Sequence, residues 1–270
     1  MNKTFTWLIF AAVFTAWAGN YYVYQSHKLE KPLFLRHYYE MPSASMEHFK
    51  LYYLTNRESK RAPIFFVTAS GLKLTIEQTK TRDEQGRIVL KEAYIAADKE
   101  QLKTINNTLS FNNLTAHYND GTSDSVEIGE MIVHPVINKI PPLESRSGGG
   151  SNQGTGYNGF VANRNVTISA VSHSFPSQLS DVITTQFKGS GSDNTNQFPM
   201  VFRKGEAGYM DYTFRLPKDD PRINNAYQIM FSYLDDKRQI AGFMNTIEQP
   251  QLYSGDLDDY IRTRKEELQR

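Results

Sequence analysis

The histidines are the first residues to consider for chemistry, because imidazole binds metals and moves protons near neutral pH. The chain has six of them, and no two are spaced as neighbouring ligands on one helix or strand face. His117 and His134 fall on two strands of a predicted hairpin, where Asp120 or Glu130 could join them as metal ligands. Surface histidines on strands are the commoner alternative, so we expect no metal site.

One histidine lies beside serines, the pair of residue types used in nucleophilic catalysis. His173 stands between Ser172 and Ser174. Neighbours on a strand point to opposite faces, so these residues cannot act on each other as nucleophile and base. The sequence also lacks a nucleophile elbow, a phosphate-binding loop, a zinc-protease motif and a dinucleotide fingerprint. We therefore predict no catalytic or cofactor-binding residues.

Acidic residues gather at predicted turns, and paired carboxylates hydrolyse glycosidic bonds. The pairs are Asp219-Asp220 and Asp235-Asp236. Turn geometry and hydration explain them equally well, so a wall-polymer hydrolase remains only an alternative. The segment from Asp120 to Asp124 loosely resembles a calcium loop, but a polar hairpin tip is the simpler interpretation.

Tyrosine is abundant and gives a third chemical possibility, a platform for sugars or peptides. The candidates are Tyr52, Tyr53, Tyr209, Tyr212, Tyr227 and Tyr233. In β-proteins the same residues usually fill the core or pair across strands. Other chemistries are excluded: without cysteine there are no disulfides or thiolate sites, and a net charge of +1 predicts no nucleic-acid partner.

The N-terminal segment, residues 1–26, determines where this chemistry would take place. Its uncharged apolar stretch predicts a membrane-anchoring helix through Phe5, Trp7, Leu8, Ile9, Phe10, Val13, Phe14 and Trp17. Tyr21, Tyr22 and Tyr24 would lie at the headgroup level. A signal peptide cleaved after Ala18 and a buried core helix are the alternatives. Lysines on both sides leave the orientation open by charge, but an anchor at the very N-terminus favours an extracytoplasmic body.

The rest of the chain indicates a mainly β fold with two sandwich-like domains. Period-two alternation, as in Leu72, Leu74 and Ile76, predicts many short strands, and Asn119-Asp120-Gly121 predicts a tight hairpin. Residues 27–145 form the first predicted domain and residues 160–252 the second. Between them, residues 146–159 are rich in glycine and serine, which predicts a flexible linker. One short helix should begin at Asp98.

Residues 253–270 predict a C-terminal amphipathic helix. Its apolar stripe carries Leu257, Tyr260, Ile261 and Leu268. This stripe could dock on a partner. Packing on the chain's own domain is commoner, and fraying is a third possibility.

The general layout resembles small membrane-anchored extracytoplasmic β-proteins of Gram-positive bacteria, although no family motif matches residue by residue. We therefore expect a non-catalytic, single-pass protein of the cell membrane that binds or positions another envelope component. Its expected partners are the lipid bilayer and an envelope protein or glycan. A glycan-binding module and a hydrolase are the alternatives, as is a protein secreted after signal cleavage.

Overall fold

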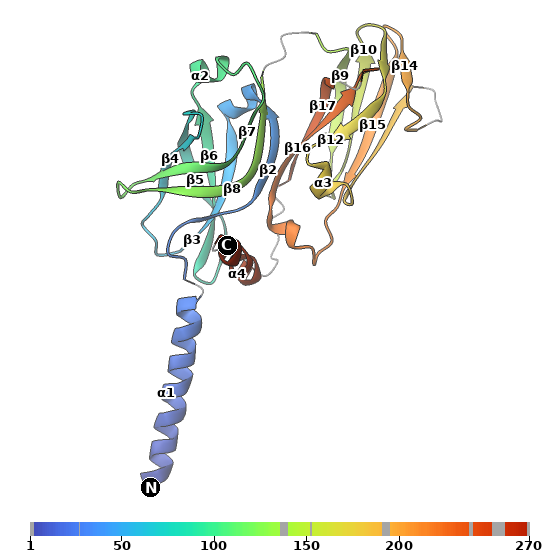
Figure 1. Ribbon diagram of the computed structural model, residues 1–270. Coiled ribbons are helices and arrows are strands. Elements are labelled where there is room, and N and C mark those ends of the chain that lie inside the picture. The colour runs from blue at the N-terminus through green and yellow to red at the C-terminus, as the bar shows by residue number, and fades with distance from the viewer. Residues whose placement is uncertain are drawn as a thin grey trace.

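The computed structural model describes residues 3–26, 28–135, 140–151, 153–190, 195–237, 240–249 and 257–268. Helix α1 (Lys3–Ser26) projects from the rest of the molecule (Figure 1). Its large side chains face solvent, with exposed fractions from 52% at Tyr21 to 75% at Trp7. The side chains of Phe5, Leu8 and Ile9 lie outside the described part. Among the described residues, no helix combines the length and the hydropathy expected of a membrane span.

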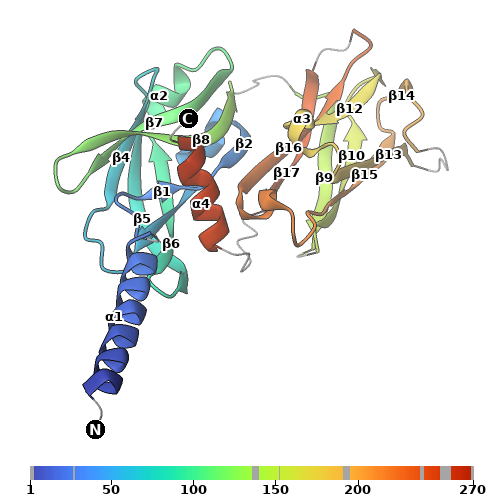
Figure 2. The same ribbon diagram turned by 60° about the horizontal axis from the view of Figure 1, so that its bottom comes forward.

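Two lobes follow α1 (Figures 1 and 2). The first lobe contains β1 (Leu33–Phe34), β2 (His37–Pro42), η1 (Ser43–Glu47), β3 (Phe49–Asn56), β4 (Pro63–Thr68), β5 (Lys73–Gln85), β6 (Ile88–Ala97), α2 (Lys99–Lys103), β7 (Leu109–Tyr118) and β8 (Ser123–His134). The second contains β9 (Leu143–Gly150), β10 (Thr155–Ala162), β11 (Val166–Ile168), β12 (Ala170–His173), α3 (Pro176–Leu179), β13 (Ile183–Gly189), β14 (Met200–Phe202), β15 (Ala207–Phe214), η2 (Pro221–Asn224), β16 (Ala226–Leu234) and β17 (Ile240–Gln249). Helix α4 (Leu257–Leu268) returns to the first lobe. The prediction of a mainly β chain is confirmed.

The largest sheet runs through both lobes. Its strand order is β1-β3-β6-β5-β4-β7-β8-β2-β16-β12, with β17 also paired to β16. The crossing point is a short parallel pairing of β2 with β16, from His37 opposite Ala226 to Tyr39 opposite Gln228. The second lobe adds a four-stranded sheet, β13-β15-β10-β9, and the pair β11-β14.

Each lobe has its own core. In the first, strand residues such as Leu51, Phe66 and Ile128 are buried together with Ile261 of α4. In the second, the inner face of the four-stranded sheet packs on β16. Phe187 of β13 and Phe231 of β16 belong to the same buried cluster. Alternate residues of these strands therefore point inward, as the period-two patterns predict.

Two local predictions match the structure. Asn119, Asp120 and Gly121 form the tight turn between β7 and β8, with Gly121 at a φ of +81°. Asp98 caps α2 by accepting hydrogen bonds from the backbone amides of Glu100 and Gln101. Both features depend on a few neighbouring residues, which is why the sequence shows them.

The prediction of a flexible linker over residues 146–159 is wrong. Residues 146–150 belong to β9 and residues 155–159 to β10, and these strands pair antiparallel from Gly150 opposite Gly156 to Ser147 opposite Gly159. Their glycines make room for neighbours: a Cβ at Gly156 would lie 2.2 Å from the hydroxyl of Tyr212. Gly/Ser composition here reflects close packing on a sheet and not a coil.

Candidate functional site

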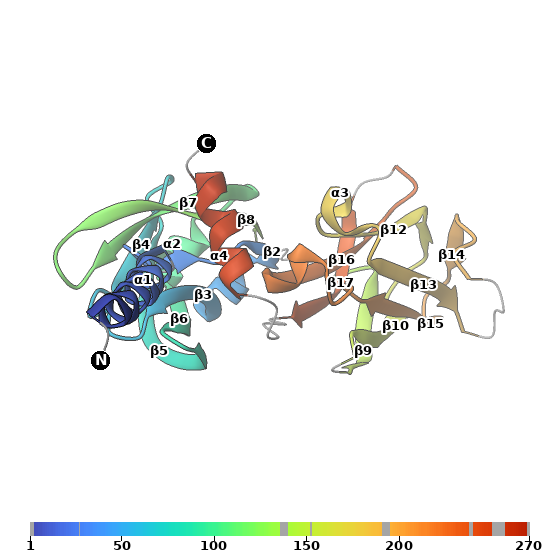
Figure 3. The same cartoon turned by 90° about the horizontal axis from the view of Figure 1, so that it is seen from below.

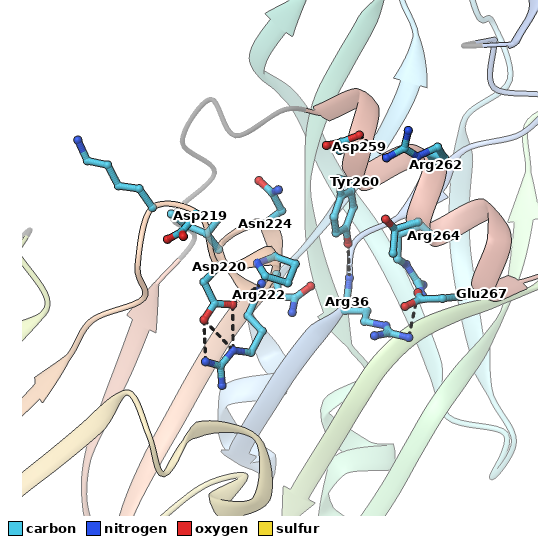
Figure 4. A pocket seen from close by; sticks show the side chains of 15 residues that line it. Arg36, Asp219, Asp220, Arg222, Asn224, Asp259, Tyr260, Arg262, Arg264 and Glu267 are labelled. Carbon is cyan, nitrogen blue, oxygen red and sulfur yellow. Dashed lines mark hydrogen bonds and ion pairs between the residues drawn. The ribbon is translucent and has the colours of Figure 1, made fainter.

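A pocket of about 480 Å³ lies between η2 of the second lobe and α4 (Figure 4). Figure 3 shows α4 on the side of the first lobe that faces the second. The lining is strongly charged and includes Arg36, Asp219, Asp220, Arg222, Asp259, Arg262, Arg264 and Glu267. A concave site with convergent charges is the ordinary place to look for ligand binding or catalysis.

On the η2 wall, Arg222 is held by two carboxylates. Its Nη2 lies 2.6 Å from Asp181 Oδ2 and 2.7 Å from Asp220 Oδ2. Hydrogen bonds from Arg222 hold the pKa of both carboxyls below its usual range. A general acid in glycoside hydrolysis needs a raised pKa, so the setting of Asp220 opposes that role.

On the α4 wall, the charges form a second network. Arg264 is only 2% exposed, and its Nη1 lies 2.9 Å from Glu267 and 3.3 Å from Glu127. Arg36, in the link between β1 and β2, adds a 3.0 Å ion pair with Glu267. These pairs tie α4 to the body and compensate part of the charge on this wall, while Nε and Nη2 of Arg264 are buried without a hydrogen-bond partner among the described residues.

The Tyr260 hydroxyl completes this wall by accepting a hydrogen bond from the Arg36 backbone amide at 3.1 Å. Burial raises the pKa of Tyr260 to about 12, so the phenol stays neutral. Tyr260→Phe would leave that amide without its acceptor. We expect it to lower the free energy of unfolding by about 1–3 kcal/mol, measured by urea unfolding. The exposed Tyr209→Phe should cost almost nothing, and equal stabilities of the two variants would contradict this role.

The apolar stripe of α4 packs on the chain's own first lobe. Tyr260 and Ile261 are buried in the first core at 8% and 2% exposure, which leaves them no surface for a partner. Leu268 is 48% exposed, and the side chain of Leu257 lies outside the described part. The docking interpretation is therefore wrong for Tyr260 and Ile261, because packing on the body satisfies the same apolar stripe.

The structure separates the two histidines proposed as metal ligands. His117 lies opposite Ser123 near the turn of the β7–β8 hairpin and stacks on Phe65, with ring centroids 4.2 Å apart. His134 ends β8 at the other end of the hairpin. Among the described residues, no three potential ligands gather into a metal site.

His134 instead belongs to a polar junction between the lobes that the sequence does not reveal. Its Nε2 lies 2.6 Å from Glu40 Oε1 of β2, and Glu40 also bonds to the side chain of Ser174 in the second lobe. Burial alone would raise the pKa of Glu40, but these two hydrogen bonds bring it below its usual value. The carboxylate separates the serine from the histidine, so the three do not form a nucleophilic triad.

Three other acidic candidates have structural partners. Asp120 and Asp124 both pair with Arg61, at 3.2 and 2.9 Å, so a guanidinium occupies the place that calcium would need. Asp235 accepts a hydrogen bond from the Lys237 backbone amide at 2.9 Å. Turn and ion-pair roles explain these residues.

Most of the tyrosine platform is core. Tyr52, Tyr53, Tyr212, Tyr227 and Tyr233 are all buried, whereas Tyr209 is 37% exposed. Tyr157, which the sequence analysis did not single out, is 47% exposed on the same sheet. The strands β10 and β15 direct both rings to the outer face of the second lobe, because their neighbours Asn158 and Met210 point inward.

Polar side chains surround these two rings. Asp211 on β15 lies opposite Tyr157 on one side and Gln186 of β13 on the other. Lys188 lies opposite Tyr209, and its ammonium is 4.5 Å from the centre of that ring. We call Tyr157, Gln186, Lys188, Tyr209 and Asp211 the outer tyrosine face.

Comparisons with known proteins give no family. No family model matches the chain, and no curated protein matches it. Among solved structures, one titled "Anomalous substructure of Titin-A168169" is 11% identical, with a TM-score of 0.22 over 80% of this chain and 96% of that one. The sialic acid binding region of a Streptococcus sanguinis SK1 adhesin bound to 3'sLn is 9% identical, with a TM-score of 0.19 over 79% and 76%. These scores are too low to carry an argument.

The polar and aromatic groups described above fall into two sets, one in the concave pocket and one on the outer surface. Most charges of the concave pocket are ion-paired, as Arg222 is with Asp220 and Arg264 with Glu267, which suits a joint between α4 and the lobes. The outer tyrosine face presents rings and hydrogen-bonding groups to solvent, and α1 presents apolar side chains.

Proposed function

We propose that the chain is a non-catalytic, membrane-anchored protein whose body binds another component of the cell envelope on the extracytoplasmic side. The observation that carries the proposal is the uncovered helix α1. Trp7, Phe10, Phe14 and Trp17 are each more than 60% exposed, at 75, 65, 68 and 62%. A folded protein in water rarely leaves so many large apolar side chains uncovered unless a membrane or a partner covers them.

Three further features of α1 support a lipid environment. Its 24 residues would extend about 36 Å, against about 30 Å for the hydrocarbon core of a bilayer. The Thr15 hydroxyl donates to the Ala11 carbonyl at 2.8 Å, so the helix satisfies this polar group by itself. Trp17 and Tyr21 stack near the end that joins the body, and such amphipathic rings favour the headgroup level.

The anchoring half of the proposal is tested by flotation of the full chain with lipid vesicles. The wild-type chain should float with the vesicles, and the double variant Phe10→Asp, Phe14→Asp should lose at least about tenfold in bound fraction, because each carboxylate is costly in the bilayer core. Ile64→Asp with Val201→Asp is a matched control, since these exposed apolar residues lie on the body. Equal flotation of both double variants would rule out anchoring through α1.

The side of the membrane is tested in intact cells. A protease added from outside should digest the body of the wild-type chain while a cytoplasmic marker stays whole. A body that resists the protease until the cells are lysed would exclude the extracytoplasmic placement. Cleavage after Ala18 would appear in the same samples as a shortened chain in the medium.

The hydrolase alternative has less support. It would require a protonated carboxyl in a cleft, whereas Arg222 keeps Asp220 ionised in the charged pocket. A binding role needs no such group, and the exposed surfaces described above suit it.

A further inference from the structure

We propose that the outer tyrosine face binds an uncharged polysaccharide built of pyranose sugars, the envelope component that the proposed function leaves unnamed. This inference rests on that function for its biological setting, but its chemistry depends only on the outer face of the β13-β15-β10-β9 sheet.

The first feature is the contact of the Tyr157 ring with a glycine of the neighbouring strand. A Cβ added at Gly149 of β9 would lie 2.8 Å from Tyr157 Cε1 and 3.4 Å from Cζ. The Cε1 edge of the ring therefore lies against Gly149 of the neighbouring strand, which is paired opposite Tyr157. The rest of the ring is open to solvent, consistent with the 47% exposure of this residue. Contact with a glycine is a structural role in itself, and it holds an aromatic ring at the surface of the sheet.

The second feature is the spacing of the two rings. Tyr157 lies opposite Asp211, and Tyr209 is two residues before Asp211 on the same strand. This diagonal relation places the two tyrosines about 7–8 Å apart, with their Cβ atoms somewhat closer. An extended sugar chain can contact both side chains at once, with a pyranose C–H face on the Tyr157 ring and hydroxyls toward the Lys188 ammonium that lies over the Tyr209 ring.

The third feature is the set of polar groups beside the rings. Asp211 and Gln186 lie opposite each other across β15 and β13, next to Tyr157. The carboxylate accepts hydrogen bonds from sugar hydroxyls, and the amide both accepts hydrogen bonds from them and donates to them. Lys188 balances the charge of Asp211, so the face offers no net field to an acidic polymer.

The same features disfavour a protein partner. Among the described residues, Tyr157 and Tyr209 are the only large apolar side chains exposed on this sheet, and polar side chains separate them. Stable protein interfaces need a contiguous apolar centre, whereas a sugar site is built from isolated rings with polar groups between them. The face also lies on the lobe away from α1, where it could reach a polymer beyond the membrane surface (Figure 1).

The test measures binding of uncharged oligosaccharides to the full chain in detergent by isothermal titration calorimetry. The probes are β-linked oligomers of glucose and of N-acetylglucosamine, about four to six units long. We expect saturable binding of at least one series, with Kd raised about tenfold by Tyr157→Ala and by Tyr209→Ala. Tyr94→Ala, on the first lobe, should leave Kd unchanged.

Since Tyr157→Ala could weaken the sheet, the wild-type chain provides a second measurement. Hydrogen exchange with and without oligosaccharide should show new protection in β10 and β15. Lack of binding by both series, unchanged Kd in both tyrosine variants, protection elsewhere, or capture of only acidic sugars or peptides by this face would overturn the proposal. Vesicle flotation by the same preparations would show that anchoring survives, so the two proposals can fail separately.

Discussion

Replacement of Gly129 by alanine is expected to lower the free energy of unfolding by at least about 3 kcal/mol, or to prevent folding. Gly129 lies opposite His37 where β8 pairs with β2, and its φ is +93°. An L residue at such an angle costs about 1–2 kcal/mol. In addition, the new Cβ would lie 2.4 Å from the carbonyl oxygen and 2.6 Å from the nitrogen of His37. Both are backbone atoms, so no side-chain rotation relieves the clash, and β2 must move.

Gly71→Ala separates the two causes of this loss. Gly71 has a φ of +85°, and an added Cβ there meets nothing within 4 Å. Chemical unfolding of the two variants should therefore show the conformational cost alone at Gly71 and a larger loss at Gly129. If both variants lose the same free energy, the close approach of β2 to β8 contributes nothing, and this account of the junction is wrong.

The features that sequence patterns predicted are those set by nearby residues. Alternating side chains mark strands such as β5, and Asp98 accepts bonds from amides only two and three residues away. The turn at Gly121 likewise needs only its own backbone angle. Each signal lies within a few positions, where local physical chemistry alone decides the outcome.

The features that sequence patterns missed depend on distant partners. Nothing near Gly156 announces that the Tyr212 hydroxyl will take the place of its side chain, so a strand resembled a linker. Glu40 and His134 meet across 94 positions of the chain. The sequence also does not show which tyrosines are exposed. Tyr209 and Tyr212 are three residues apart and lie on opposite faces of β15, but only the fold shows which of the two faces is the outer one.

The same distance in sequence conceals His37, whose acid sensitivity is the second large effect. The ring is fully buried and bridges three strands: Nδ1 donates to the Ile128 carbonyl at 3.1 Å, while Nε2 accepts from the Tyr52 amide at 2.8 Å. This pattern fits only the neutral imidazole with its proton on Nδ1. Burial, aided by the positive charge of Arg264, lowers the pKa of His37 from 6.5 to about 4.

We therefore expect the chain to lose up to about 3 kcal/mol of stability through His37 as the pH falls from 6.5 to about 4. In this window His37 binds a proton in the unfolded chain but not in the native one. The full contribution of His37 to the free energy of unfolding is therefore present only above pH 6.5. His37→Gln keeps a donor and an acceptor but cannot titrate, so its unfolding free energy should fall less steeply with acid. His48→Gln replaces a side chain that is 75% exposed and should keep the wild-type slope. Parallel pH profiles for wild type and His37→Gln would show that the buried ring is not the acid-sensitive group.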